Sequence, residues 1–174
     1  MQQQNIILTG FMGTGKSTLG RRLAQRLGYT FVDTDELIEE RCGCTIAEIF
    51  ADRGESWFRQ QEEALVRDLA GRQGLVIATG GGLVMNPVNV AALQASGRII
   101  CLSATPPEIL ARVSRQRQVR PLLQGDDPLT AIRELLERRQ PVYRQFPQLV
   151  TSGRSIDQLI EDLLALLAAP PASP

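Results

Sequence analysis

Short apolar runs alternate along the chain with longer segments whose apolar residues recur at helical spacing. The runs at 5–9, 29–33, 75–79 and 98–102 have the length of strands, and 148–151 is a weaker fifth. The third run lacks polar alternation, as buried parallel strands do. Because strands and helices alternate throughout, we expect parallel strands with right-handed crossovers, forming one sheet covered by helices on both faces. We predict no internal repeat and no second domain.

Several of the helices carry clear start signals. Capping boxes open helices at Thr45, Thr105 and Ser155, each followed three residues later by glutamate or glutamine. Asn86 and Asp127 each precede a proline and supply a cap for two further helices. The last helix is expected to bury one stripe of apolar residues: Ile156, Leu159, Ile160, Leu163 and Leu167.

The strongest chemical signal lies between the first strand and the first helix. Residues 10–18 read Gly-Phe-Met-Gly-Thr-Gly-Lys-Ser-Thr and fit the phosphate-binding pattern G-x-x-x-x-G-K-[ST]. The glycines allow successive backbone N–H groups to surround a phosphate at the positive end of a helix. Lys16 would reach the β- and γ-phosphates, and the Ser17 hydroxyl would ligate a magnesium ion. Lys16 is the only lysine among 19 basic residues, which favours a role for its slim ammonium.

The second strand ends in two carboxylates, Asp33 and Asp35. The carboxyl ends of parallel strands form the edge where ligands bind in open α/β sheets, so both residues are candidates for the site. An alternative is that Asp35 merely caps the helix that starts at residue 36.

Glycine-rich and arginine-rich elements follow further along. Gly54 is predicted to break a helix, and Arg59 lies among apolar neighbours near the start of the next one, where the helix dipole disfavours a cation. Three glycines at 80–82 are costly in entropy unless something approaches their backbone closely. Four arginines and no acid fall between 112 and 120, which fits either a solvated basic loop or a mobile lid over phosphates.

Composition narrows the class of protein. The 174 residues are 43% hydrophobic, enough for one domain, and the formal net charge is zero, so no overall field draws the chain to nucleic acid or an anionic membrane. No segment approaches the roughly 18 apolar residues of a membrane span, and no signal peptide is recognisable, so we expect a cytoplasmic protein. Cys42, Cys44 and Cys101 are expected to be buried or partly buried thiols, since no histidine completes a zinc site.

A phosphate loop followed by acidic, glycine-rich and arginine-rich elements suggests phosphoryl transfer. A GTPase is disfavoured because the guanine-reading Asn-Lys-x-Asp segment needs a second lysine, and the size of the chain disfavours a large motor ATPase. Without histidine, proton transfer must fall to carboxylates, water or the substrate's phosphate. A small-molecule kinase remains.

From residue 6 to about residue 167 the chain resembles the shikimate kinase family, which has the nucleoside-monophosphate-kinase-like P-loop fold. The resemblance rests on motifs that occur in the family's order: the phosphate loop at 10–18; Asp33-Thr34-Asp35; the F-R-x-x-E at 58–62; the glycines at 80–82; Arg120-Pro121-Leu122; and the R-x-P-x-Y at 139–143. It implies a three-layer α/β/α domain over 1–168, with a five-stranded parallel sheet in the order 2-3-1-4-5. A substrate-binding region at about 33–62 and a lid at about 112–126 are also implied, and a disordered tail is expected at 169–174.

The resemblance further implies ATP-dependent phosphorylation of the shikimate 3-hydroxyl to shikimate 3-phosphate, on the chorismate route to aromatic amino acids. Lys16 and Arg120 would neutralise the transferring phosphoryl group, and Asp35 would hold the reacting hydroxyl, either accepting its proton or only orienting it. Arg59 and Arg139 would clamp the shikimate carboxylate. The implied nucleotide contacts are Gly13, Thr14, Gly15, Lys16, Ser17, Thr18, Arg120 and Arg112, the last stacking on adenine. Phe50, Phe58, Gly80, Gly81 and Gly82 would line the substrate pocket, and Ser17 with Asp33 would hold Mg²⁺ directly or through water.

Two other functions are open to such a sequence. One is a kinase for another small polyol acid such as gluconate, which the F-R-x-x-E and R-x-P-x-Y pair disfavours. The other is a regulatory protein that holds ATP without transferring its phosphate, which the presence of Asp35, Arg59 and Arg139 disfavours. A monomer that binds ATP and shikimate, and neither nucleic acid nor membrane, is expected.

Overall fold

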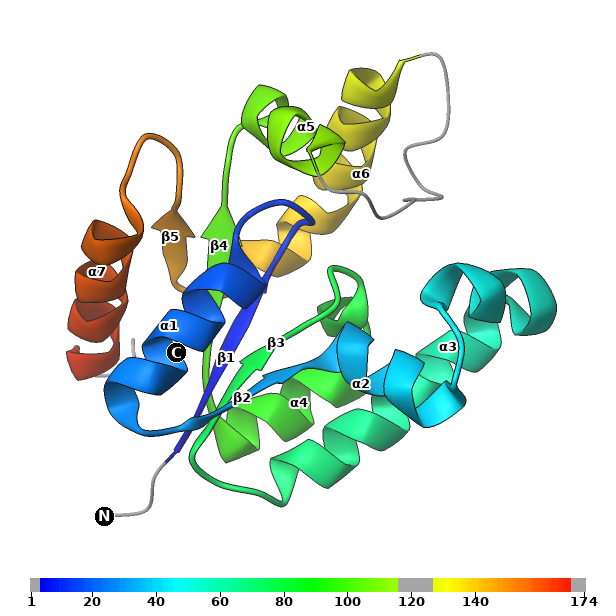
Figure 1. The fold of residues 1–174 in the computed structure, drawn as a ribbon, viewed down its shortest axis with the longest axis horizontal. Helices are drawn as coiled ribbons and strands as arrows, with labels where there is room; N and C mark the ends of the chain where they lie inside the picture. The colour runs from blue at the N-terminus through cyan, green and yellow to red at the C-terminus, as the bar shows by residue number, and fades with distance from the viewer. Residues whose placement is uncertain (1–3, 116–126, 170–174) are drawn as a thin grey trace.

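The computed structural model describes residues 4–115 and 127–169, and its parallel sheet lies between two layers of helices (Figure 1). The strands pair in the order β2-β3-β1-β4-β5, which confirms the expected topology. Their bounds are β1 (Asn5–Gly10), β2 (Thr30–Asp33), β3 (Leu75–Ala78), β4 (Gly97–Ser103) and β5 (Gln148–Val150). The helices are α1 (Lys16–Leu27), α2 (Thr34–Cys42), α3 (Ile46–Ala70), α4 (Pro87–Ser96), α5 (Pro106–Ser114), α6 (Pro128–Tyr143) and α7 (Ile156–Ala168), with a short 3₁₀ helix η1 (Leu83–Met85).

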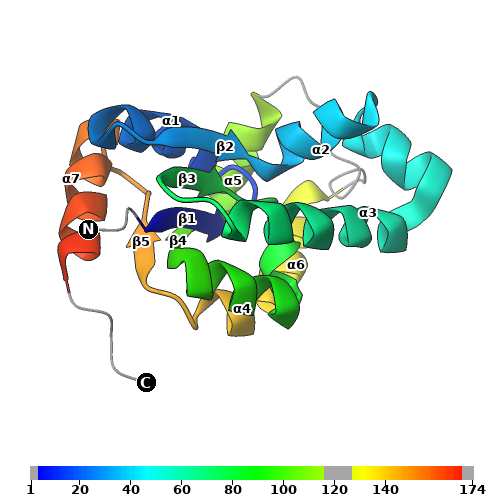
Figure 2. The same cartoon turned by 90° about the horizontal axis from the view of Figure 1, so that it is seen from below.

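Alternate side chains of the central strand enter two hydrophobic cores on opposite faces of the sheet. Ile6 and Leu8 pack in a core with buried residues of α1 and α7, whereas Ile7 packs in a larger core with buried residues of α3, α4 and α6. Figure 2 shows α1 on one side of the sheet and α4 and α6 on the other. Both faces of the sheet are therefore covered, as the apolar strands predict.

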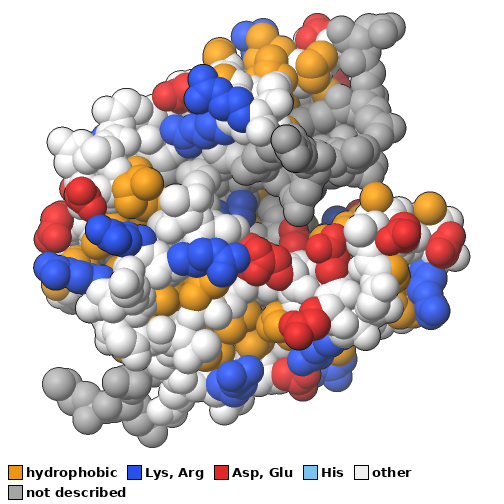
Figure 3. Space-filling model, viewed as in Figure 1, with side chains coloured by type: hydrophobic (Ala, Val, Ile, Leu, Met, Phe, Trp, Pro, Cys, Tyr) orange, Lys and Arg blue, Asp and Glu red, His pale blue; other side chains and the backbone are white. Residues whose placement is uncertain are grey.

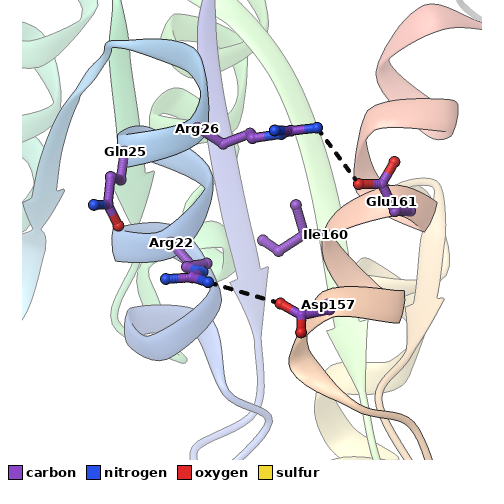
Figure 4. A pocket seen from close by; sticks show the side chains of 6 residues that line it. All are labelled: Arg22, Gln25, Arg26, Asp157, Ile160 and Glu161. Atoms are coloured by element: carbon purple, nitrogen blue, oxygen red, sulfur yellow. Dashed lines mark ion pairs between the residues drawn. The ribbon is translucent and has the colours of Figure 1, made fainter.

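Helices α1 and α7 lie side by side on one face, and a shallow groove of about 530 Å³ separates their exposed sides. Two long ion pairs cross it, Arg22–Asp157 at 3.9 Å and Arg26–Glu161 at 3.8 Å (Figure 4). Their side chains are 59–87% exposed, so these pairs contribute little to stability. Ile160 is 5% exposed and belongs to the core beneath, so apolar packing joins the two helices.

Helix starts follow the predicted caps. Capping boxes form at Thr45, Thr105 and Ser155, and the Asn86 and Asp127 side chains accept hydrogen bonds from the first turns of α4 and α6. No helix within 4–115 or 127–169 is long and apolar enough to cross a membrane.

The buried stripe predicted for α7 is wrong at its first residue. Ile156 is 45% exposed, while Leu159, Ile160 and Leu163 are buried and Leu167 is partly buried against the same core. Ile156 is where the helix begins, one turn before the part that packs on the sheet, so helical spacing alone overestimates the stripe. The three cysteines are free thiols, fully or partly buried as expected.

Candidate active site

The phosphate loop joins β1 to α1 and takes a conformation that its glycines permit. Gly13 and Gly15 have φ values of 73° and 95°, in the left-handed region that other residues rarely adopt. The Lys16 ammonium lies over the loop and donates hydrogen bonds to the carbonyl oxygens of Gly10 and Phe11, both at 2.8 Å. Because α1 begins at Lys16, the N–H groups of its first turn point toward the same loop, and the whole element is suited to an anion.

Asp33 connects the phosphate loop to the start of α2. One of its carboxylate oxygens accepts from the backbone nitrogens of Asp35 and Glu36, and the other accepts from the Ser17 hydroxyl at 2.6 Å. Asp33 is therefore the cap of α2, and the alternative that Asp35 merely caps this helix is wrong. The helix begins at Thr34, two residues earlier than expected, which leaves the Asp35 side chain for other contacts.

The pairing of Ser17 with Asp33 also bears on the expected metal. It brings a hydroxyl and a carboxylate together at the start of α1, beside the loop that suits phosphate. Oxygen donors of this kind are those Mg²⁺ prefers, so the residues present fit the ion that the sequence analysis implies.

The glycines at 80–82 each leave room for a different charged side chain. A Cβ atom at positions 80, 81 and 82 would lie 2.5, 2.9 and 2.7 Å from an oxygen of Asp35 and from guanidinium nitrogens of Arg139 and Arg59, respectively. None of the three glycines has a positive φ, so space rather than backbone freedom requires them. Three residues from distant parts of the sequence thus converge on one turn, which confirms the expected close approach to this backbone.

Two hydroxyl groups that sequence reasoning missed hold this turn in place. The backbone N–H of Gly80 donates to the Thr34 hydroxyl at 2.8 Å, and the Tyr143 hydroxyl donates to the Gly81 carbonyl at 2.6 Å. Burial raises the pKa of Tyr143 to about 12, so its hydroxyl keeps the proton that it donates. Both residues belong to motifs noted in the sequence, but nothing local shows that they meet the glycine turn.

Arg59 is held by two acids of its own helix. Its guanidinium donates to Glu62 at 2.7 Å and to Glu55 at 2.9 Å. Glu62 is 1% exposed, and its second oxygen, Oε1, has no hydrogen-bond partner in the described part of the chain. Burial raises the pKa of Glu62 to about 7, although Arg59 opposes the shift. Sequence reasoning gave Glu62 no role; an acid at helical spacing between apolar Phe58 and Leu65 was the available signal.

Aromatic rings border this cluster. The rings of Phe50 and Phe58 lie 5.0 Å apart, on either side of the kink that Gly54 makes in α3 with φ 79° and ψ 170°. Arg139 is 8% exposed and lies 5.7 Å from the ring centre of Phe11. In the space-filling view the surface is hollowed beside the part built from α2 and α3, with acidic side chains at the edge of the hollow (Figure 3).

Arg112 contacts the phosphate loop from α5. Its Nη1 donates to the Gly13 carbonyl at 3.2 Å and to the Thr151 hydroxyl at 3.0 Å, and its Nη2 donates to the Thr151 carbonyl at 3.4 Å. The expected stacking of Arg112 on adenine stays a prediction. Arg120, most of the expected lid and residues 170–174 of the tail lie outside the described residues.

The sequence matches one protein family over most of its length. The family model described as shikimate kinase matches residues 12–168. The chain belongs to the shikimate kinase family. It is 45% identical to a shikimate kinase of Caldanaerobacter subterraneus, over 92% of this chain and 94% of that one. It is 47% identical to that of Pelotomaculum thermopropionicum, over 94% and 95%.

Solved structures agree with this family. A shikimate kinase of Acinetobacter baumannii in complex with shikimate has a TM-score of 0.90 and 36% identity, covering 98% of this chain and 96% of that one. A gluconokinase of Sinorhizobium meliloti has a TM-score of 0.60 and only 18% identity, so it shares the fold alone. The comparisons therefore favour a shikimate kinase over a gluconate kinase.

Proposed function

We propose that the residues converging on the phosphate loop and the glycine turn carry out the reaction of the family. This reaction transfers the γ-phosphoryl group of ATP to the 3-hydroxyl of shikimate and gives shikimate 3-phosphate and ADP. The observation that carries the assignment is the packing of Asp35, Arg139 and Arg59 against one turn. Asp33, two residues before Asp35, accepts a hydrogen bond from Ser17 of the phosphate loop. The residues that would hold shikimate therefore lie next to the loop that would hold ATP.

The two arginines suit the carboxylate of shikimate. Planar guanidinium groups bind carboxylates through paired hydrogen bonds, and Arg59 and Arg139 border the same turn from α3 and α6. Glu62 fixes Arg59 from the buried side, and Phe50 with Phe58 forms an apolar wall. In this arrangement Asp35 accepts a hydrogen bond from the 3-hydroxyl and orients it for attack.

The phosphate loop supplies the charge that the transfer needs. Phosphoryl transfer passes through a loose transition state, so positioning and charge neutralisation provide most of the catalysis. Backbone N–H groups of residues 13–18 and the Lys16 ammonium would hold the phosphates, with Arg112 at the nucleotide and Arg120 at the transferring group. Ser17 and Asp33 would hold Mg²⁺, which neutralises phosphate charge when bound. Every group named comes from one chain, so a monomer suffices and remains the prediction, as does a cytoplasmic location.

A coupled assay for ADP release tests the function directly. Purified protein with Mg²⁺ and ATP should release ADP quickly with shikimate and only at background rate with gluconate or with no acceptor. Lys16→Met serves as a control that should retain the fold and lose turnover. If shikimate gives no ADP above background, the proposed reaction fails. Faster release with gluconate would transfer the assignment to the other polyol acid.

A further inference from the structure

The capping box at the start of α5 differs from the other two in the described structure. In α3 and α7, the third residue of the helix, Glu48 or Gln158, accepts hydrogen bonds from its own capping residue. Glu108 accepts from Thr105 in the same way, but it also accepts from the hydroxyl of Ser152, which follows β5. These bonds lower the pKa of Glu108 to about 2, that of Ser152 most, so it is a carboxylate at any assay pH.

One turn further along the same face of α5, Arg112 donates hydrogen bonds to Thr151, the residue before Ser152. Two of its nitrogens bond to Thr151, and one also bonds to the Gly13 carbonyl of the phosphate loop. Positions 108 and 112 are four apart and lie on one face of a helix, so α5 meets Thr151 and Ser152 with both side chains. The same helix touches the loop backbone closely, since a Cβ at Gly13 would lie 2.9 Å from the Val113 side chain.

Thr151 is itself firmly placed. It is 3% exposed, and both its backbone N–H and its hydroxyl donate to the carbonyl of Ser103 at the end of β4, at 2.8 and 3.1 Å. Thr151 and Ser152 therefore link the edge of the sheet to α5. A guanidinium donates its hydrogen bonds in its own plane, so the bonds that Arg112 donates fix the orientation of that plane and use its edges rather than its faces.

We propose that Glu108, Thr151 and Ser152 are positioning residues for the nucleotide. They hold Arg112 against the phosphate loop in one orientation, so that a face of the guanidinium meets the base of ATP while the loop holds its phosphates. This inference rests on the proposed function, in which Arg112 contacts the nucleotide. It adds that the contact depends on a hydrogen-bonded link between α5 and the residues after β5.

Ser152→Ala tests the link most cleanly, because it removes one hydroxyl, which bonds to Glu108 and accepts a long bond of 3.4 Å from the Thr105 N–H, and keeps the bonds between Thr105 and Glu108. We expect KM for ATP and Kd for ADP to rise about 3- to 10-fold, the net effect of one ordinary hydrogen bond, because Ser152 acts on the nucleotide only through α5. KM for shikimate and Kd for tripolyphosphate, which has no base, should change less than about twofold, within the scatter of uncoupled sites. Glu108→Gln is the second variant, since glutamine still completes a capping box; it should raise KM for ATP in the same direction but by less, because its neutral amide oxygen accepts the Ser152 bond more weakly.

Matched controls separate this role from general packing. Ser96→Ala removes a hydroxyl that bonds to Leu93 within α4, and Glu48→Gln makes the same change in a capping box of α3. Neither control should shift the KM for ATP. Melting temperatures of all variants show whether each one folds.

Arg112→Ala, alone and combined with Ser152→Ala, completes the test. If Ser152 acts through Arg112, the double variant should have the same KM for ATP as Arg112→Ala. An unchanged KM for ATP in both Ser152→Ala and Glu108→Gln, or a Ser152→Ala effect that adds in full to that of Arg112→Ala, would overturn the inference. If Arg112→Ala itself leaves nucleotide binding unchanged, the assignment of Arg112 in the proposed function fails, and the inference fails with it.

Discussion

At Gly82 the missing side chain is what gives Arg59 its place. An alanine methyl there would lie 2.7 and 2.8 Å from the two terminal guanidinium nitrogens. The backbone at Gly82 is helical, with φ −95° and ψ −10°, so alanine itself is tolerated and the fold should survive. Because the end of an arginine side chain can move, we expect Gly82→Ala to displace Arg59 and raise KM for shikimate about 10- to 100-fold.

Steady-state kinetics with each substrate varied in turn measures this effect. KM for ATP should stay near its wild-type value, because Gly82 lies beside Arg59 and not at the phosphate loop. A normal KM for shikimate in a folded Gly82→Ala protein would remove Arg59 from the substrate site.

The candidate residues were predictable by type, but their partners were not. The spacing of Asp33 and Asp35 left two roles open, and only the folded structure shows that Asp33 caps α2 while Asp35 reaches the glycine turn. Glu62 went without a role because its function depends on burial and on Arg59, and the sequence pattern reports neither. Side-chain pairing across distant segments is a tertiary property, which local pattern does not encode.

Among the secondary-structure elements, α3 shows how a single glycine changes the direction of a helix. Gly54 has φ 79° and ψ 170° inside this helix, a conformation that costs other residues about 1–3 kcal/mol. We therefore expect Gly54→Ala to lower the free energy of unfolding by that amount. The kink lies between Phe50 and Phe58, so KM for shikimate should also rise.

Gly71→Ala is the matched control for Gly54→Ala. Gly71 follows the same helix with an ordinary φ of −76°, and a methyl there would have only ordinary contacts. It should leave stability unchanged or raise it by about 0.4–1 kcal/mol. Urea denaturation measures the free energy of unfolding of both variants. Equal values for Gly54→Ala and Gly71→Ala would mean that the backbone at Gly54 carries no strain in the folded protein.

The starts of most helices, though not that of α2, were predictable because caps are local. Thr45, Thr105 and Ser155 each start a helix where the capping boxes indicate. The sheet order depended instead on the family resemblance, since alternating strands and helices permit several orders. Ile156 shows the limit of periodicity: it continues the apolar spacing of α7 but lies outside the core.

The molecule as a whole has a formal net charge of zero, yet side chains of opposite charge lie close together at the site. Glu62 is buried against Arg59, and Asp35 and Arg139 also act on its charge. Its pKa is about 7 in the folded protein, against 4.5 for an unperturbed glutamate. The folded state therefore binds the proton more tightly between pH 4.5 and 7, so the free energy of unfolding should fall as pH rises through this interval.

Glu62→Gln isolates this contribution from that of other groups. The free energy of unfolding of this variant should lack the pH-dependent contribution of Glu62. The stability of the wild type should therefore fall by up to about 3 kcal/mol relative to the variant between pH 4.5 and 8. Glu48, Glu108 and Asp127 have lowered pKa values and oppose this trend only at lower pH, and they are common to both proteins. Urea denaturation at several pH values measures both stabilities. If the curves of wild type and Glu62→Gln against pH run parallel, the raised pKa of Glu62 is contradicted.

The same titration should couple to substrate binding. In the proposed site the shikimate carboxylate and ionised Glu62 would share the Arg59 guanidinium, and the two anions would repel each other in a buried setting. Binding should therefore raise the pKa of Glu62 further, so that the complex takes up a proton near neutral pH and Kd for shikimate rises as pH increases through about 7. Calorimetry in two buffers of different ionisation enthalpy measures this proton uptake. Glu62→Gln should abolish it and flatten the pH dependence of Kd, and an unchanged uptake in this variant would assign the proton to another group.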